Sequence, residues 1–262
     1  MNASADPNEL DRLNARLSQL MQQHAQLFDR LRDGQTEFRR LARSVWRMQE
    51  EEQRRIAREL HDGVGQNLAA LGHRLDNAIA ALPPGATAVD ELLQKARDLA
   101  RATLADTRSL SRLLRPQILD DLGIEAALRW LIRSMGEESG LDICATLPQC
   151  LPQLNGDLST LIFRVVQEAL GNILKHAGAR QATIMLDIDA SRLRLMIADD
   201  GHGCDAAAAL AAGAAGHSSG LGGMRDRVRL FDGQFRFESE PGHGSCVRIN
   251  LPLATDSAGR MP

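Results

Sequence analysis

The spacing of apolar residues divides the chain into a helical N-terminal part and a C-terminal part in which helices alternate with strands. From Leu10 to Met48 the apolar positions recur at alternating intervals of three and four residues. This is the seam of a heptad repeat, flawed at His24 and Gly34, and it predicts a coiled coil. After Met48 the apolar positions resume at Ile56, a slip of four residues that would locally unwind the coiled coil.

Two amphipathic helices follow and predict a helical hairpin. The first carries an apolar stripe at helical spacing and ends at the sequence Pro83-Pro84-Gly85. The second carries a similar stripe and ends at Pro116. Two such hairpins from two chains would bury their stripes in a four-helix bundle, which predicts a homodimer. The stripe of the first helix consists of Ile56, Leu60, Val64, Leu68, Leu71, Leu75, Ile79 and Leu82.

The first hairpin helix places three polar side chains beside its stripe. At about 100° per residue, His61 lies just off the stripe, while Asp62 and Gln66 share a more exposed face one turn apart. Gly63 and Gly65 lie in the same turns, although each costs about 1 kcal/mol in a helix interior. Glycines at these positions would let a large partner approach His61. A lone histidine is usually an ordinary surface residue, so this group gains meaning only from residues downstream.

The helix predicted over 158–179 has a wide buried face and one polar stripe. Glu168, Asn172, Lys175 and His176 line that stripe at i, i+4, i+7 and i+8. An acid, an amide and two bases on one face suit a metal-bound triphosphate, because Mg²⁺ prefers oxygen ligands and phosphate prefers cations. A solvated helix face is the alternative for this stripe taken alone.

Two glycine-rich segments lie further along the chain. A strand predicted over 192–198 runs into DDGHG, where the Asp199 carboxylate can accept a hydrogen bond from an exocyclic amine. Gly201 and Gly203 would let a planar ring lie against the backbone. The second segment, SGLGGMRDRV at 219–228, opens a helix whose free N–H groups favour phosphate. Each signal is weak by itself, and the chain has no P-loop sequence.

The remaining pattern predicts a mixed α/β domain. A strand is expected around 141–147, and 235–253 has the pattern of two strands around a Pro-Gly turn. Small residues fill 206–220, which fits either a short mobile lid over a nucleotide or an inert loop.

The order of these segments resembles that of the histidine kinases of two-component systems, specifically the nitrate-sensor-like and DesK-like class. His61, Asp62 and Gln66 match the phosphoacceptor motif His-Asp-x-x-x-Gln. The segments QEALGNILKHA, DDGHG and GLGGMRDRV are similar to its N-box and its two glycine boxes. The segment LRPQILDDLGIEAALRWL is similar to its connector between domains. The resemblance covers about residues 48–253 and departs mildly at Ser245, where Thr is usual.

The resemblance implies that the cofactors are ATP and Mg²⁺. Adenine would lie near the first glycine box, and Asn172, with Glu168, would hold the metal. Cationic side chains and the second glycine box would meet the phosphates. The implied nucleotide-binding residues are Asp199, Gly201, Gly203, Lys175, His176, Gly220, Gly222, Gly223 and Ser245.

The resemblance also implies the chemistry. His61 would attack the γ-phosphate, and Asp62 would hold its tautomer or accept its proton. The phosphoryl group would pass to an aspartate on the receiver domain of a response regulator, usually one with a helix-turn-helix output. Gln66 would aim a water at that phosphorylated partner in a phosphatase reaction. Input would come through the N-terminal coiled coil or a sensory protein bound to it.

Composition narrows the function classes. A net charge of −3 and a pI near 6.2 argue against direct binding to nucleic acid or a membrane surface. No apolar run approaches the roughly 18 residues of a membrane span, and the start of the chain does not resemble a signal peptide. A cytoplasmic enzyme is therefore expected. The four cysteines show no metal spacing and are expected to be reduced thiols. A redox role for Cys204 or a pH-sensing role for His24 is a weaker alternative to no role.

The sequence as a whole predicts a multidomain protein. The expected order is an N-terminal coiled-coil input helix over 1–47, a dimerisation and phosphotransfer hairpin over 48–118, an α/β sandwich (Bergerat-type) ATP-binding domain over 119–253, and a flexible tail over 254–262.

Two other functions stay open at this stage. Another ATPase with the same nucleotide fold, such as an anti-sigma serine kinase or a chaperone-like ATPase, would not need the motif at His61. A degenerate kinase that serves only as a dimeric scaffold is disfavoured by intact His61, Asn172 and Asp199.

Overall fold

A computed structural model describes residues 7–83, 86–114, 117–148, 154–214 and 219–253. The chain separates into two compact units, residues 1–49 and 50–262. The predicted tail over 254–262 lies outside the described residues. Within the described residues, none of the helices combines the length and apolar character that crossing a bilayer requires.

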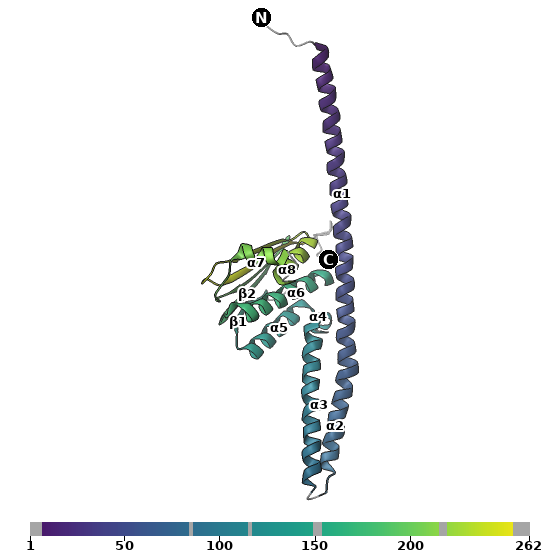
Figure 1. Cartoon of the computed structure of the whole chain (residues 1–262), viewed down its shortest axis with the longest axis vertical. Helices are drawn as coiled ribbons and strands as arrows, with labels where there is room; N and C mark the ends of the chain where they lie inside the picture. The colour runs from purple at the N-terminus through teal and green to yellow at the C-terminus, as the bar shows by residue number, and fades with distance from the viewer. Residues whose placement is uncertain (1–6, 84–85, 115–116, 149–153, 215–218, 254–262) are drawn as a thin grey trace. The chain divides into compact units, whose positions relative to one another are not determined.

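The first unit consists of helix. α1 begins at Pro7 and continues past the unit boundary to Glu59 (Figure 1). The seam side chains are exposed in a single chain, with Leu31 65% and Phe38 71% exposed. Side chains of this size are stabilised when a second helix covers them, which favours the predicted coiled coil.

The second unit begins with a helical hairpin over residues 50–114, within the range 48–118 predicted for it. Its first arm comprises the end of α1, a π-helix η1 (Leu60–Gly65) and α2 (Gln66–Ala80); its second arm is α3 (Thr87–Leu114). The two arms lie side by side (Figure 1). A buried hydrogen bond from Ser111 Oγ to the carbonyl of Ala57, 2.9 Å long, joins them.

One chain by itself covers only part of the apolar stripe of the first arm. Val64 and Leu71 are 44% and 45% exposed, whereas Gly65 and Gly72 are buried. A Cβ at Gly65 would lie 3.9 Å from Leu104 Cδ1 of α3, an ordinary contact distance, so Gly65 faces the second arm. The π-helix η1 changes the helical phase at this point. One hairpin therefore covers only part of the apolar surface that the sequence provides.

The α/β domain, predicted over 119–253, is built on a five-stranded sheet, and its elements run from Gly123 to Pro252. The strand order is β1-β2-β3-β5-β4, with β1 parallel to β2 and the other neighbours antiparallel. The predicted strands around 141–147 and 192–198 and the C-terminal hairpin are confirmed. The bounds are β1 (Asp142–Thr146), β2 (Gln181–Ile188), β3 (Arg192–Asp199), β4 (Gln234–Ser239) and β5 (Ser245–Pro252).

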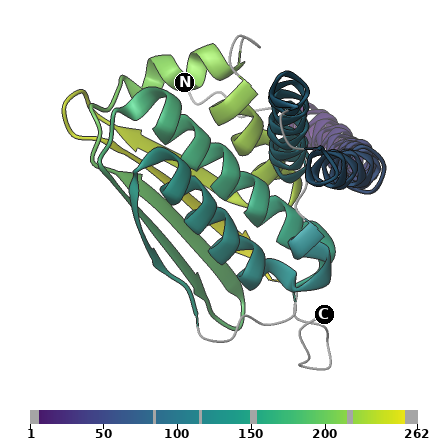
Figure 2. The same ribbon diagram turned by 90° about the horizontal axis from the view of Figure 1, so that it is seen from below.

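Helices cover one face of this sheet, as Figure 2 shows. They are α5 (Gly123–Ser139), α6 (Gly156–Asn172), α7 (Ala206–Ala214) and α8 (Ser219–Leu230), preceded by the short connector α4 (Gln117–Asp121). The core lies between the helices and the sheet. Its fully buried side chains include Leu128, Leu161, Phe163, Leu170, Ile184, Leu193, Ile197, Met224 and Leu251. The first part of the predicted lid is the nine-residue helix α7, and residues 215–218 lie outside the described residues.

Candidate nucleotide site and phosphoacceptor helix

Helix α6 forms one wall of the candidate site. Its first turn is capped by Asn155, whose Oδ1 accepts the backbone N–H groups of Asp157 and Leu158 at 2.7 and 3.2 Å. The apolar face packs into the core, and Glu168 and Asn172 are half-buried beside Gly220 at the start of α8. After Asn172 the helix continues as the π-helix η2 (Ile173–Ala177) and ends at Gly178, which adopts the left-handed conformation with φ 59°.

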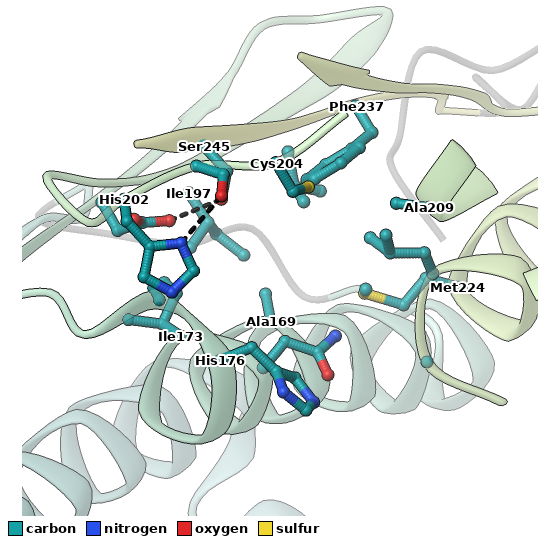
Figure 3. A pocket seen from close by; sticks show the side chains of 17 residues that line it. Ala169, Ile173, His176, Ile197, His202, Cys204, Ala209, Met224, Phe237 and Ser245 are labelled. Atoms are coloured by element: carbon teal, nitrogen blue, oxygen red, sulfur yellow. Dashed lines mark hydrogen bonds between the residues drawn. The ribbon is translucent and has the colours of Figure 1, made fainter. Parts of the chain in front are cut away.

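A cavity of about 280 Å³ lies between α6, the ends of β3 and β5, and α8. Apolar side chains form most of its lining, and Figure 3 places Phe237 and Met224 on the side opposite His202. A mostly apolar cavity with a few polar groups is the usual form of a small-molecule site. The lining residues are Ala169, Asn172, Ile173, His176, Ala177, Ile197, Asp199, His202, Gly203, Cys204, Ala209, Gly220, Leu221, Met224, Phe237, Ser245 and Val247.

The Asp199 carboxylate is fixed at the polar end of this cavity. Its Oδ1 accepts the backbone N–H of Gly201 at 2.8 Å, and its Oδ2 accepts the hydroxyl of Ser245 at 2.5 Å. Asp199 and Ser245 face each other in the β3–β5 register, so the sheet itself brings the two side chains together. A carboxylate oxygen can accept more than one hydrogen bond, so Asp199 retains the capacity to bind an exocyclic amine.

The next residue, Asp200, binds backbone groups instead of facing the cavity. Its Oδ1 accepts the backbone N–H groups of Arg180 and Gln181 at 2.8 and 2.9 Å, which ties the start of the loop to β2. Both hydrogen bonds lower the pKa of Asp200 because they stabilise the charged carboxylate. The bond from Gln181 has the larger effect, and that from Arg180 follows. Of the two adjacent aspartates, Asp199 therefore faces the cavity and Asp200 anchors the loop.

Two glycines of the first glycine box are required by close approach. A Cβ at Gly201 would clash with the Ala177 carbonyl oxygen and lie 2.7 Å from both Ala177 Cβ and Asp199 Oδ1. Gly203 has φ 62°, and a Cβ there would clash with the backbone carbonyl oxygen of Glu240. Only Gly203 of this pair lines the cavity, so Gly201 acts by allowing η2 and Asp199 to approach each other.

The second glycine box meets α6 at the other end of the cavity. A Cβ at Gly220 would lie 2.9 Å from Glu168 Oε1 and 3.1 and 3.2 Å from the two side-chain atoms of Asn172. A carboxylate oxygen and an amide oxygen thus face the first turn of α8 from the same helix. These are the hard oxygen donors that Mg²⁺ prefers, so the residues present fit that metal.

The structure does not bring every predicted residue to the cavity. The predicted residues that are absent from its described lining are Glu168, Lys175, Gly201, Gly222 and Gly223, and Lys175 is exposed. The prediction assumed regular helical spacing across 168–176, but η2 changes that spacing after Asn172, and only His176 of the two predicted bases lines the cavity. The roles predicted for all the site residues, those that line the cavity included, stay predictions.

Sequence reasoning missed several residues of the cavity. His202 lies inside the DDGHG segment, and its Nδ1 lies 2.8 Å from the carbonyl oxygen of Gly203. Phe237 and Met224 were treated only as parts of a strand and a helix. The alternation of β4 carried the available signal, because Phe235 and Phe237 must point to the side of the sheet that the helices cover.

His61, Asp62 and Gln66 lie on the hairpin and are all exposed. His61 and Asp62 lie within η1, and Gln66 begins α2. The α-helix α1 is regular at Glu52, where the heptad phase of the sequence slips. The helix changes from α to π geometry later, at the turn that contains His61. π-helical turns are rare and occur often at functional sites. None of the three residues lines the cavity.

Comparisons with known proteins agree with this architecture. A histidine kinase profile matches residues 52–119, and the profile of the histidine kinase-, DNA gyrase B- and HSP90-like ATPases matches residues 157–255. The chain therefore belongs to the histidine kinase family. The first profile covers the hairpin with its exposed histidine, and the second covers the cavity.

Individual relatives carry related names. The sensor histidine kinase MctS of Rhizobium johnstonii is 32% identical over 230 residues, which is 87% of this chain and 49% of that protein. The histidine-protein kinase/phosphatase DegS of Brevibacillus brevis is 30% identical over 211 residues, 79% of this chain and 53% of that protein. The chain thus spans about half the length of these relatives. The histidine kinase domain of the blue-light activated kinase EL346 of Erythrobacter litoralis is 17% identical, with a TM-score of 0.43 over 74% of this chain and 98% of that one.

Proposed function

We propose that this chain is an ATP-dependent protein histidine kinase that phosphorylates His61 and passes the phosphoryl group to an aspartate of a response regulator. The observation that carries the proposal is the combination of two features in one chain. One is an exposed His-Asp pair at a π-helical turn, and the other is a cavity closed by Asp199, Ser245 and Asn172. Neither feature alone would define this reaction.

ATP fits the cavity with its base toward Asp199. The fixed carboxylate accepts the exocyclic amine, while Ile197, Met224 and Phe237 provide apolar surface for the ring. The phosphates then extend toward Asn172 and the first turn of α8, where backbone N–H groups are free to donate. His176 lines the cavity and would supply positive charge at the edge of this region, and Lys175 would have to reach the phosphates from the exposed side of η2.

Glu168 and Asn172 are the residues that would hold Mg²⁺. Their oxygen atoms lie beside Gly220, at the place where α6 and α8 meet. When bound, the ion offsets the charge of the phosphates that it contacts. The absence of a side chain at Gly220 leaves room for this arrangement.

The acceptor chemistry belongs to η1. An imidazole nitrogen of His61 forms a bond to the γ-phosphorus while the bond to the bridging oxygen of ADP breaks. The second ring nitrogen gives its proton to Asp62, the adjacent carboxylate. The exposure of both side chains leaves them open to a nucleotide or to a receiver domain. Gln66 lies about one turn beyond Asp62 and would orient a water for the phosphatase reaction.

We infer that the working unit is a homodimer. Exposed apolar residues on both arms, among them Val64, Leu71, Leu92 and Leu99, require a partner surface, and a second hairpin supplies one. The partner for phosphotransfer is a receiver domain, usually joined to a helix-turn-helix output. A sensory protein bound to the N-terminal coiled coil remains the candidate for the input, and a cytoplasmic location fits this role.

The test is phosphotransfer. The chain is first incubated with Mg-ATP labelled on the γ-phosphate, and purified receiver domains from the same genome are then added. The proposal expects the label to move rapidly to one receiver and to be absent with Asn172→Ala. An anti-sigma-type kinase would instead place an acid-stable label on a serine, and a scaffold would give no label.

A further inference from the structure

A buried ion pair joins the α/β domain to the hairpin. Arg164, on α6, and Glu50, on α1, have side chains that are 11% and 8% exposed. Arg164 Nε donates to the two carboxylate oxygens of Glu50 at 3.0 and 3.1 Å, and its Nη2 donates to Oε2 at 2.8 Å. Both residues belong to the second compact unit of the chain. Charge-assisted bonds of this kind are stronger than neutral ones, particularly where water is excluded.

The same guanidinium also reaches the second arm of the hairpin. Its Nη2 donates to the carbonyl oxygen of Leu114, the last residue of α3, at 2.6 Å, and to the side chain of Gln53. Nη1 donates to Gln167 within α6 at 2.9 Å. A single side chain of the α/β domain is thus bound to the base of both hairpin arms.

The connector between the domains is held at the same place. Arg54 Nε lies 2.8 Å from Asp120 Oδ2, so α4 is joined to α1 beside Gln53. Movement of the α/β domain relative to the hairpin must therefore separate Arg164 from Glu50 and the Leu114 carbonyl. Removing one member of a buried ion pair leaves the other charge desolvated and unpaired, so this contact strongly favours one domain arrangement.

The contact lies close to the nucleotide site along two elements. On α6, Arg164 is one turn before Glu168 and two turns before Asn172. On α8, the guanidinium of Arg227 lies beside Gly223, with Nη2 3.3 Å from the position of a Cβ there. Burial lowers the pKa of Arg227, and the carboxylates of Glu168 and Glu50 oppose that effect. The Arg164 guanidinium lowers the pKa of Arg227 further, so Arg227 interacts electrostatically with both members of the interdomain ion pair.

In this arrangement the cavity does not include His61, the proposed phosphoacceptor. Within the described part of the chain, every residue that lines the cavity falls between Ala169 and Val247, and no residue of the hairpin is among them. We propose that Arg164, bound to Glu50, Gln53 and the Leu114 carbonyl, is a latch that holds the α/β domain in a resting position and must open before His61 is phosphorylated. Glu50 and Gln53 lie on α1, the helix that begins at Pro7, so rotation of this helix would withdraw both partners from Arg164.

This inference rests on the proposed phosphorylation of His61 and concerns its regulation. The variants are Glu50→Gln, Arg164→Ala and the double variant. The control is Glu52→Gln, because Glu52 forms an exposed ion pair with Arg55 in the same helix, with an Oε1–Nη2 distance of 2.5 Å. At saturating Mg-ATP, each latch variant should autophosphorylate about tenfold faster than wild type, because the resting population is lost. The KM for ATP should stay unchanged, since the cavity is untouched.

The double variant should be no faster than either single variant, because both remove the same contact. The control should match wild type. Rates that stay the same or fall in folded variants would overturn the latch, as would additive effects. If Arg164→Ala does not fold, Glu50→Gln and Gln53→Ala carry the test, because both changes lie outside the α/β domain.

A second measurement separates this inference from the proposed function. Hydrogen exchange of α4 and the end of α3 is measured in a His61→Gln background, where no phosphoryl transfer occurs. Glu50→Gln should accelerate exchange there and Glu52→Gln should not. Faster exchange without any label in the His61-containing proteins would refute the proposed function and keep the latch. Normal labelling with unchanged exchange would refute the latch alone.

Discussion

Substitution of Gly201 by Ala should disrupt the candidate nucleotide site through packing alone. The added Cβ would clash with the Ala177 carbonyl oxygen and lie 2.7 Å from Asp199 Oδ1. The carbonyl is part of the backbone that ends η2, and the carboxylate is held by Ser245, so neither can move without loss. Overpacking of this kind costs about 1–3 kcal/mol of folding stability. Displacement of Asp199 should add a loss of about 1.5–3 kcal/mol in nucleotide affinity, roughly a factor of 10–100.

The matched control is Gly171→Ala, on the neighbouring helix α6. A Cβ at Gly171 meets nothing within 4 Å. Replacement of a helical glycine by alanine should therefore raise stability by about 0.5–1 kcal/mol. The assays are thermal unfolding and calorimetric titration with a non-hydrolysable ATP analogue. A Gly201→Ala protein that melts and binds like wild type would refute the assigned geometry of the first glycine box, especially if Gly171→Ala were the more damaged variant.

Three further predictions concern single polar groups. Ser245→Ala removes the hydroxyl that donates to Asp199, so ATP affinity should fall by about 0.5–1.5 kcal/mol, whereas Ser245→Thr should retain it; equal titrations for both variants would contradict this role. The pKa of Asp200 is lower in the folded protein than in the unfolded chain, where it is about 3.9. Its ionised carboxylate therefore stabilises the fold fully at pH values above the unfolded-state pKa, and this stabilisation is lost as the pH falls through the folded-state pKa. Asp200→Asn should therefore flatten the acid limb of a stability-versus-pH curve, and an unchanged acid limb would argue against the anchor. Gln66→Ala should lose phosphatase activity toward the phosphorylated regulator while it keeps autophosphorylation, and dephosphorylation at the wild-type rate would make Gln66 an ordinary surface residue.

Periodicity predicted the elements of this chain because their faces are strongly patterned. The alternation over 192–198 became β3, and the apolar stripe over 158–179 became α6 and η2. The prolines placed the ends of the hairpin helices correctly, since proline removes a backbone donor and restricts the residue before it. The order of the motifs was sufficient to identify the family.

The two π-helices could not be predicted from spacing. Both occur where a regular pattern had been assumed, at His61 and just after Asn172. A π-turn changes which side chains share a face, and Lys175, three residues after Asn172 on η2, does not line the cavity. Contacts between distant segments could not be predicted either, because no local sequence pattern pairs Arg164 with Glu50 across more than a hundred residues.

The central claim is that ATP bound at this cavity phosphorylates His61. The most direct measurement is incubation with γ-labelled Mg-ATP, followed by tests of acid and base stability, for wild type and for His61→Gln and His73→Gln. His73 is an exposed histidine on α2 and serves as the matched control. Phosphorylation of His61 should give an acid-labile, base-stable label that disappears in His61→Gln and persists in His73→Gln. Label that persists in His61→Gln would contradict it.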